Sequence, residues 1–209
     1  MWILYAFGSA CFAGLTAVLA KCGIEHTNSH LATALRTIVV LIFSWIMVGI
    51  VGSFDTIHTI THKTFLFLIL SGISTGVSWL CYFKALQQGN INKVTAVDKT
   101  SVVLTIILSL IFFKECVTVY KIIGMIILTT GTYLMVEKKE DNKQTNNAWL
   151  LYAVLSVIFA SLTTILGKIG ITNIESNLGT AIRTSVVLIM SWIVVFVTHS
   201  QMNMKSIPK

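Results

Sequence analysis

Seven apolar stretches dominate this sequence, and each is long enough to cross a lipid bilayer as a helix. They lie at about residues 2–22, 31–52, 65–87, 94–113, 118–137, 149–169 and 178–198. A membrane-spanning helix needs about 20 predominantly apolar residues. Because no water reaches the hydrocarbon core, each stretch must pair its own backbone N–H and C=O groups, as an α-helix does. The pattern predicts an all-α integral membrane protein with about seven transmembrane helices.

Composition supports a lipid environment and excludes a nucleic-acid-binding domain. Charged residues make up 11% of the chain, whereas a soluble domain usually carries about 25%. The net charge is +7, but the basic side chains stand at the ends of apolar stretches and not together on one soluble face. We expect the lipid bilayer as a partner and no nucleic acid. The first stretch starts at Trp2 without a basic leader or cleavage site, so we interpret it as a retained span.

An internal duplication links the two ends of the chain. The segment from Trp2 to Met47 returns from Trp149 to Val194 without a gap, and 26 of the 46 aligned positions are identical. General lipid-facing composition would reproduce Leu, Ile and Val, but it would not reproduce charged residues and tryptophans in register. The matched pairs of this kind are Trp2 and Trp149, Lys21 and Lys168, Arg36 and Arg183, and Trp45 and Trp192.

Counting spans predicts that the two copies are inverted with respect to one another. Five spans separate each position in the first copy from its equivalent position in the second copy. Because five is odd, the second copy enters the membrane from the opposite face. Inverted repeats are typical of secondary transporters. We divide the chain into a five-helix repeat at 1–137, a polar linker at 138–147 and a second repeat at 148–209 that is truncated after two helices.

By its motifs and their order, the chain resembles the EamA-like branch of the drug/metabolite transporter superfamily. The motifs are WILYA…FAGLTAVLAK, LATALRTIVVLIFSW, SGISTGVSWLCYFKALQQGN, KVTAVDKTSVVLT and IIGMIILTTGTYLMV. The resemblance covers one five-helix unit and the first two helices of a second. It implies ten helices in two inverted units around a central cavity, with export or exchange of small metabolites without ATP.

No catalytic or metal-binding pattern is found in the sequence. HExxH, GxSxG and phosphate-loop motifs are absent. The four cysteines have no CxxC spacing, which argues against a metal centre or a disulfide framework. We therefore expect no enzymatic activity, no cofactor and no metal.

Ionisable residues inside spans are the candidates for a substrate path. Lys21, Arg36, Lys84, Asp98 and Lys99 all fall toward the same membrane face when the spans are threaded antiparallel. A charge at the bilayer centre costs about 2.5–3.5 kcal/mol on insertion scales, so it normally faces protein or water. Lys21 and Lys84 could either line a cavity or extend their side chains to the lipid headgroups. Arg36 lies deeper in its span, which favours a position in a cavity. Asp98 and Lys99 could either neutralise each other's charge or contact a substrate.

The duplication extends this hypothesis to the other membrane face. Lys168 and Arg183 repeat Lys21 and Arg36, so two basic vestibules would face one another across the midplane. Such vestibules favour an anionic or zwitterionic metabolite, with Asp98 as a candidate for proton coupling.

Aromatic and small residues on the third predicted span each allow two interpretations. Trp79 and Tyr82 suit either a cavity wall or the aromatic belt at the membrane interface. Gly72 and Gly76 form a GxxxG pattern, for which close helix packing is the favoured interpretation.

The leading functional hypothesis is a multi-pass secondary transporter of small organic metabolites in the cell (cytoplasmic) membrane. The alternative is a non-transporting membrane protein, either a truncated product or a helper. As partners beyond the lipid and the substrate, we consider a homodimer or another five-helix unit.

Overall fold

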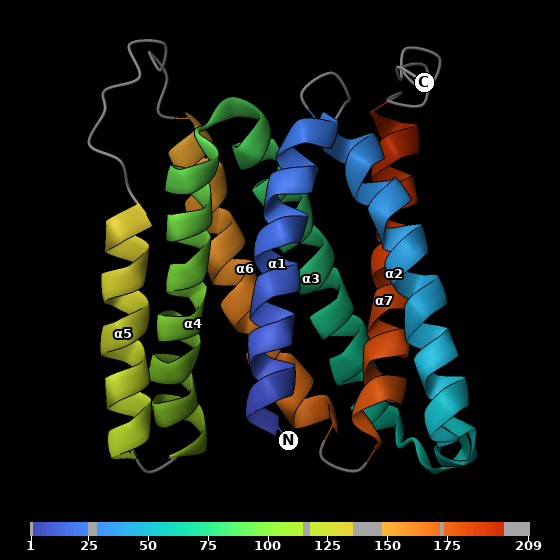
Figure 1. The fold of residues 1–209 in the computed structure, drawn as a ribbon. Coiled ribbons are helices and arrows are strands. Elements are labelled where there is room, and N and C mark those ends of the chain that lie inside the picture. Colours follow the sequence, from blue (N-terminus) through green and yellow to red (C-terminus); the bar gives the residue numbers. More distant parts are fainter. Residues whose placement is uncertain (1, 25–28, 115–117, 136–147, 172–173, 199–209) are drawn as a thin grey trace.

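The chain folds as a bundle of helices. The computed structural model describes residues 2–24, 29–114, 118–135, 148–171 and 174–198 (Figure 1). In these ranges seven α-helices and one short 3-10 helix form, and no strand does. The helices are α1 (Trp2–Ile24), α2 (Ser29–Val51), α3 (His62–Gln88), α4 (Ile91–Phe113), α5 (Val119–Met135), α6 (Ala148–Gly170) and α7 (Ser176–Val197), with η1 (Ser53–Thr59) between α2 and α3.

The helix lengths confirm the all-α membrane architecture. Six helices are long and apolar enough to cross a bilayer, and α5, with 17 residues, is shorter. The predicted spans agree with the helices to within a few residues. The short helix η1 was not predicted; it begins after Gly52, which has a positive φ of 74°. The predicted linker at 138–147 lies outside the described residues.

Helix α3 stands at the centre of the bundle and packs most extensively against α6 and α7. Small residues allow this approach. A Cβ atom added to Gly72 would lie 2.8 Å from Cβ of Val186 on α7. One added to Gly76 would lie 2.9 Å from the side chain of Met190. The GxxxG pattern therefore serves helix packing, as the sequence indicated.

A row of hydroxyl groups joins α3 to α6 along the same contact. The Ser71 hydroxyl donates to the Thr163 carbonyl oxygen at 2.9 Å, and the Ser78 hydroxyl donates to the Ser156 carbonyl oxygen at 3.0 Å. Thr75 Oγ1 lies 3.3 Å from Thr163 Oγ1. These side chains are buried, and in a lipid environment such hydrogen bonds hold helices together.

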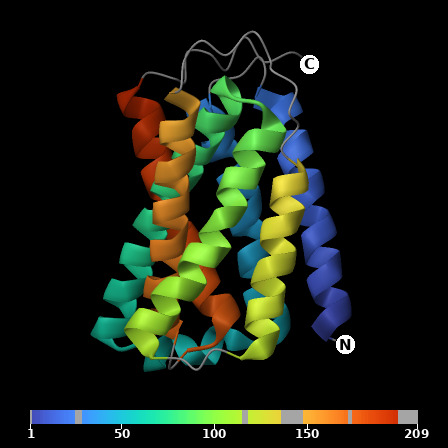
Figure 2. The same ribbon diagram turned by 90° about the vertical axis from the view of Figure 1, so that its left-hand side faces the viewer.

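Helices α1 and α5 lie at the periphery of the bundle, as Figures 1 and 2 show from two directions. No residue in the apolar part of α1 is buried within the bundle. The outer surface carries large apolar side chains, and among them Tyr5 is 71% exposed, Ile50 73% and Leu134 76%. In water a surface of this kind would drive association, whereas acyl chains solvate it.

The two copies of the repeated segment run in opposite directions through the bundle. In Figure 1, α1 begins at the lower end and α6 begins at the upper end, and α2 and α7 are likewise antiparallel to each other. This arrangement agrees with the odd number of intervening spans. The division of a complete protein into two five-helix units remains a prediction.

Candidate functional site

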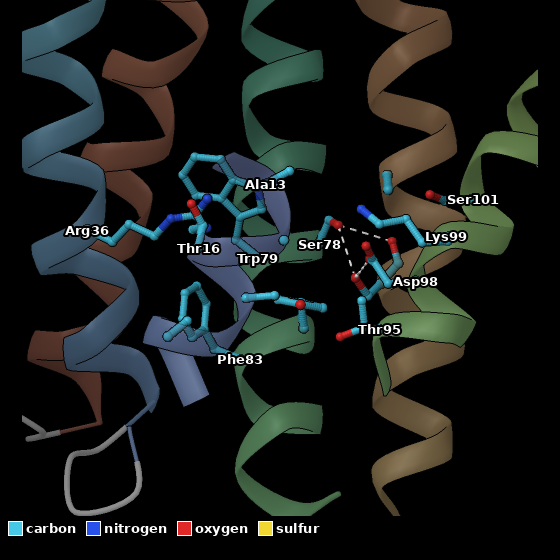
Figure 3. Close-up of a pocket in the computed structure, with 16 residues that line it drawn as sticks. Ala13, Thr16, Arg36, Ser78, Trp79, Phe83, Thr95, Asp98, Lys99 and Ser101 are labelled. Atoms are coloured by element: carbon cyan, nitrogen blue, oxygen red, sulfur yellow. Dashed lines mark hydrogen bonds between the residues drawn. The ribbon is translucent and has the colours of Figure 1, made fainter. Parts of the chain in front are cut away.

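A cavity of about 290 Å³ opens inside the bundle, toward the end at which α1 finishes and α2 begins (Figure 3). Five helices contribute to its wall, with a face of small residues from α1. Those small residues are Ala13, Gly14, Thr16, Ala17 and Ala20. The remaining lining residues are Arg36 from α2, Ser78, Trp79, Tyr82 and Phe83 from α3, Thr95, Asp98, Lys99 and Ser101 from α4, and Ser156 and Ala160 from α6.

Arg36 reaches the cavity from the second turn of α2 and lies against aromatic rings. Its guanidinium carbon is 4.5 Å from the centre of the Trp79 ring and 5.5 Å from the centre of the Phe83 ring. Within the described part of the chain, no carboxylate forms an ion pair with this guanidinium. Aromatic faces attract a cation but do not neutralise it. The positive charge of Arg36 is therefore available to an anionic group in the cavity.

Asp98 stands on the other side of the cavity, at the junction of α3, α4 and α6. Its Oδ1 accepts a hydrogen bond from the Ser156 hydroxyl at 3.4 Å. The Ser156 hydroxyl also lies 3.3 Å from the Ser78 hydroxyl. Figure 3 shows Ser78 and Asp98 on facing sides of this group. Lys99 lines the same cavity. The cavity thus presents a cationic group from α2, Arg36, and a cationic group and a carboxylate from α4, Lys99 and Asp98.

Five of the nine residues predicted for a substrate path come together in this cavity: Arg36, Trp79, Tyr82, Asp98 and Lys99. The structure therefore places both aromatic side chains at a cavity wall. Their neighbours Ser78 and Phe83 extend the same face of α3, since positions 78, 79, 82 and 83 lie together on a helix.

The other four predicted residues lie outside the cavity. Lys21 donates hydrogen bonds to the Leu86 and Gly89 carbonyl oxygens, the latter at 3.1 Å, and so satisfies carbonyls at the end of α3. Lys84 donates to Gln87 Oε1 at 3.3 Å. Lys168 is exposed, and its Nζ lies 4.5 Å from the centre of the Phe113 ring. Arg183 is half-buried between α3, α6 and α7.

Sequence reasoning missed several polar residues of the cavity, namely Thr16, Ser78, Thr95 and Ser156. Ser, Thr and small residues are common throughout these spans, so residue type alone did not distinguish cavity positions from packing positions. One pattern could have identified Ser78: hydroxyl residues recur at positions 71, 75 and 78, which lie on one face of the third span.

The arrangement can hold a small charged solute inside a membrane-embedded bundle. It offers an aromatic-backed guanidinium, an ammonium group, a carboxylate and several hydroxyl groups around one cavity. Among the described residues, no group of three or more His, Cys, Asp or Glu side chains could hold a metal ion. A polar cavity among apolar, membrane-crossing helices is the arrangement expected of a multi-pass membrane protein that binds a small solute.

Comparison with known proteins gives the family. Residues 1–137 match the model of the EamA-like transporter family, and the chain belongs to that family. It is 39% identical over 134 residues to an "Uncharacterized transporter in cobO 3'region" from Sinorhizobium sp, a match that covers 64% of this chain and 95% of the relative. It is 27% identical over 115 residues to the "Uncharacterized transporter YxxF" of Bacillus subtilis, covering 54% of this chain and 37% of that relative. No solved structure matches.

Proposed function

We propose that the protein carries a small anionic or zwitterionic metabolite across the cell membrane as an ATP-independent secondary transporter. The observation that carries this proposal is the Arg36 guanidinium, which lies in a cavity against Trp79 with no ion pair in the described residues. Keeping an uncompensated charge within a membrane domain is costly. A bound anionic group would offset that cost.

The positions of opposite charges give the substrate an orientation. An anionic group on Arg36 places the rest of a small solute toward Asp98 and Lys99, on the far wall of the same cavity. We propose Asp98 as the group that couples transport to protons, because its carboxylate lies in the cavity and accepts a hydrogen bond from Ser156 on α6. Protonation of Asp98 would then change the hydrogen bond between Asp98 on α4 and Ser156 on α6.

The test is uptake of an anionic and zwitterionic metabolite panel by liposomes that contain the purified protein, with and without an imposed proton gradient. Loss of a charged hydrogen-bonding group costs about 1.5–3 kcal/mol, so we expect Arg36→Gln to weaken uptake of the substrate about tenfold or more. Lys63→Gln, an exposed cation at the start of α3, should leave uptake unchanged.

Separate outcomes address the two parts of the proposal. Uptake of every tested solute that is unaffected by Arg36→Gln would refute the anion site. Asp98→Asn should abolish stimulation by the proton gradient while substrate exchange without a gradient persists. Full stimulation of that variant would refute coupling through Asp98.

The alternative function is a helper membrane protein that pairs with another five-helix unit. The exposed faces of α1 and α2 favour it, because their large apolar side chains have few neighbours within the bundle. Transport by liposomes that contain this chain alone would argue against the helper function.

A further inference from the structure

Thr95 is a buried threonine of α4 whose hydroxyl group has no hydrogen-bond partner among the described residues. Its side chain is 8% exposed and lines the cavity that holds Arg36 (Figure 3). Leaving a buried hydroxyl group unpaired is costly, so such a group calls for an explanation. The hydroxyl groups of Ser29 and Ser191 are also buried without a partner in the described chain, but neither lines this cavity.

Several threonines in the other helices satisfy their hydroxyl groups within their own helix. The Thr37 hydroxyl donates to the Thr33 carbonyl oxygen at 2.7 Å, and the Thr75 hydroxyl donates to the Ser71 carbonyl oxygen at 2.8 Å. A bond of this kind to the preceding turn is common for threonine in a helix. Thr75 is 8% exposed, which matches the burial of Thr95. Burial therefore does not prevent this bond, and the Thr95 hydroxyl is left for another partner.

The surroundings of Thr95 indicate the chemistry of that partner. Asp98 follows Thr95 by about one helical turn and lines the same cavity. The Tyr82 hydroxyl is close to Thr95, but the two groups do not form a hydrogen bond of regular geometry. The Asp98 carboxylate would repel a second anionic group, and an apolar group would leave the Thr95 hydroxyl unpaired. A neutral hydroxyl group on the solute fits, because it can donate to one of these oxygens and accept from another.

We propose that Thr95 is a specificity-determining residue, whose hydroxyl bonds to a hydroxyl group of the solute held by Arg36. The substrate class is then small organic anions that carry a hydroxyl group, in preference to the same anions without it. A site built to bond a substrate hydroxyl rejects the analogue that lacks it, because the polar group of the site then stays unpaired. This inference rests on the proposed function, since Arg36 holds the anionic end of the solute.

The first measurement asks whether the Thr95 hydroxyl is unpaired in the ligand-free protein. Thr95→Val keeps the shape of the side chain and removes the hydroxyl, so the melting temperature in detergent micelles should be unchanged or higher. Thr75→Val is the matched control, because its hydroxyl is bonded at the same burial. This control should lower the melting temperature by about 2–4 °C. An equal decrease in both variants would overturn the inference, because Thr95 would then have a structural partner.

The second measurement uses butyrate and three butyrates that carry one hydroxyl group, at the second, third or fourth carbon. The isomers place the hydroxyl at increasing distances from the carboxylate, and a bound anion raises the melting temperature. At least one isomer should reach the same rise as butyrate at about three- to tenfold lower concentration. This preference should vanish in Thr95→Val. It should persist in Thr100→Val, which removes an exposed hydroxyl that donates to the Val97 carbonyl oxygen and does not line the cavity.

The remaining outcomes separate this inference from the proposed function. Equal binding of butyrate and all three isomers, lost in Arg36→Gln, would overturn the role of Thr95 and leave the anion site in place. A hydroxyl preference that persists in Thr95→Val would overturn that role as well. Tighter binding of an aminobutyrate than of any hydroxy isomer would overturn the hydroxyl class in favour of an ammonium group at Asp98. Absence of binding by all four anions would overturn this inference, whereas the uptake panel decides the proposed function.

Discussion

Arg36 lies in surroundings that differ from those of an ordinary buried cation. A buried charge in a protein is normally paired with an opposite charge. Here the guanidinium rests against the Trp79 and Phe83 rings, with centroid distances of 4.5 and 5.5 Å. The rings hold the planar group in place and leave its N–H donors for a ligand. The geometry favours recognition of an anion over neutralisation within the protein.

At this scale we predict that Trp79→Leu weakens substrate binding. A cation–π contact contributes about 0.5–2 kcal/mol, so the half-saturation concentration for uptake should rise about two- to thirtyfold. The measurement is concentration-dependent uptake in liposomes. Tyr133→Leu, which changes a 70% exposed aromatic side chain on α5, is the control and should leave the value unchanged. An equal rise in both variants would indicate a general effect on the membrane domain.

The sequence located part of the cavity because charged residues are rare in membrane spans. Arg36, Asp98 and Lys99 were conspicuous for that reason, and all three line the cavity. Lys21 was equally conspicuous, but its Nζ reaches carbonyl oxygens at the end of α3. The length of a lysine side chain permits either use, and only the position of the neighbouring helix decides between them.

At the scale of elements, the close crossing of α3 and α7 depends on Gly72 and Gly76, which have no side chains. We predict that Gly72→Ala destabilises the protein, because its Cβ would lie 2.8 Å from Val186 Cβ and 2.9 Å from the Arg183 carbonyl oxygen. Overpacking of this kind costs about 1–3 kcal/mol. Thermal unfolding in detergent micelles should show a lower melting temperature.

The matched control for that substitution is Gly124→Ala on α5. No atom lies within 4 Å of a Cβ added there, and replacing a helical glycine by alanine gains about 0.5–1 kcal/mol. The melting temperature of this variant should be unchanged or higher. A decrease of the same size in both variants would contradict the close crossing of α3 and α7.

Glu175 joins two elements outside the spans. It is the N-cap of α7 and accepts hydrogen bonds from the Asn177 and Leu178 amides at 2.8 and 3.1 Å, and from the Ser53 hydroxyl of η1 at 2.8 Å. Partial burial acts to raise the pKa of this carboxyl group. The hydrogen bonds from Ser53, Leu178 and Asn177 outweigh that effect and hold the pKa below its usual value.

We predict that this cap stabilises the protein above about pH 4.5 and that its contribution is lost as the pH falls through the lowered folded-state pKa. Loss of an N-cap side chain costs about 1 kcal/mol. Glu175→Ala should therefore lower the melting temperature at pH 7, and the difference from the parent protein should shrink at acidic pH. A difference that stays constant down to pH 3 would contradict the role of the ionised carboxylate.

At the scale of the whole molecule, the opposite directions of the two repeat copies give a direct prediction. A variant with Cys22 as its single cysteine carries a thiol near the end of α1, and a cysteine-free variant with Lys168→Cys carries one near the end of α6. In Figure 1 these helices end at opposite faces of the bundle. In sealed vesicles of uniform orientation, a membrane-impermeant maleimide should label one variant from outside and the other only after lysis. Labelling of both from the same side would refute the inverted arrangement.

The overall fold was largely predictable because a bilayer allows so few structures. Segment length and apolarity alone placed the helices, and the count of spans between the repeated segments predicted their opposite directions. The neighbours of each helix were not predictable in this way. Lipid and protein interior are both apolar, so the sequences of α1 and α6 resemble one another although one face of α6 is buried in the bundle and the apolar part of α1 has no buried residue.

The central place of α3 has a consequence for how the protein is made. Its hydroxyl face, with Ser71, Thr75 and Ser78, finds its partners on α6, which the ribosome completes only after α4 and α5. During that interval the newly inserted α3 must keep these groups satisfied through its own backbone, as the Thr75 bond to the Ser71 carbonyl oxygen already does. We therefore expect an early membrane-inserted state in which the hydroxyl face of α3 has not yet met α6.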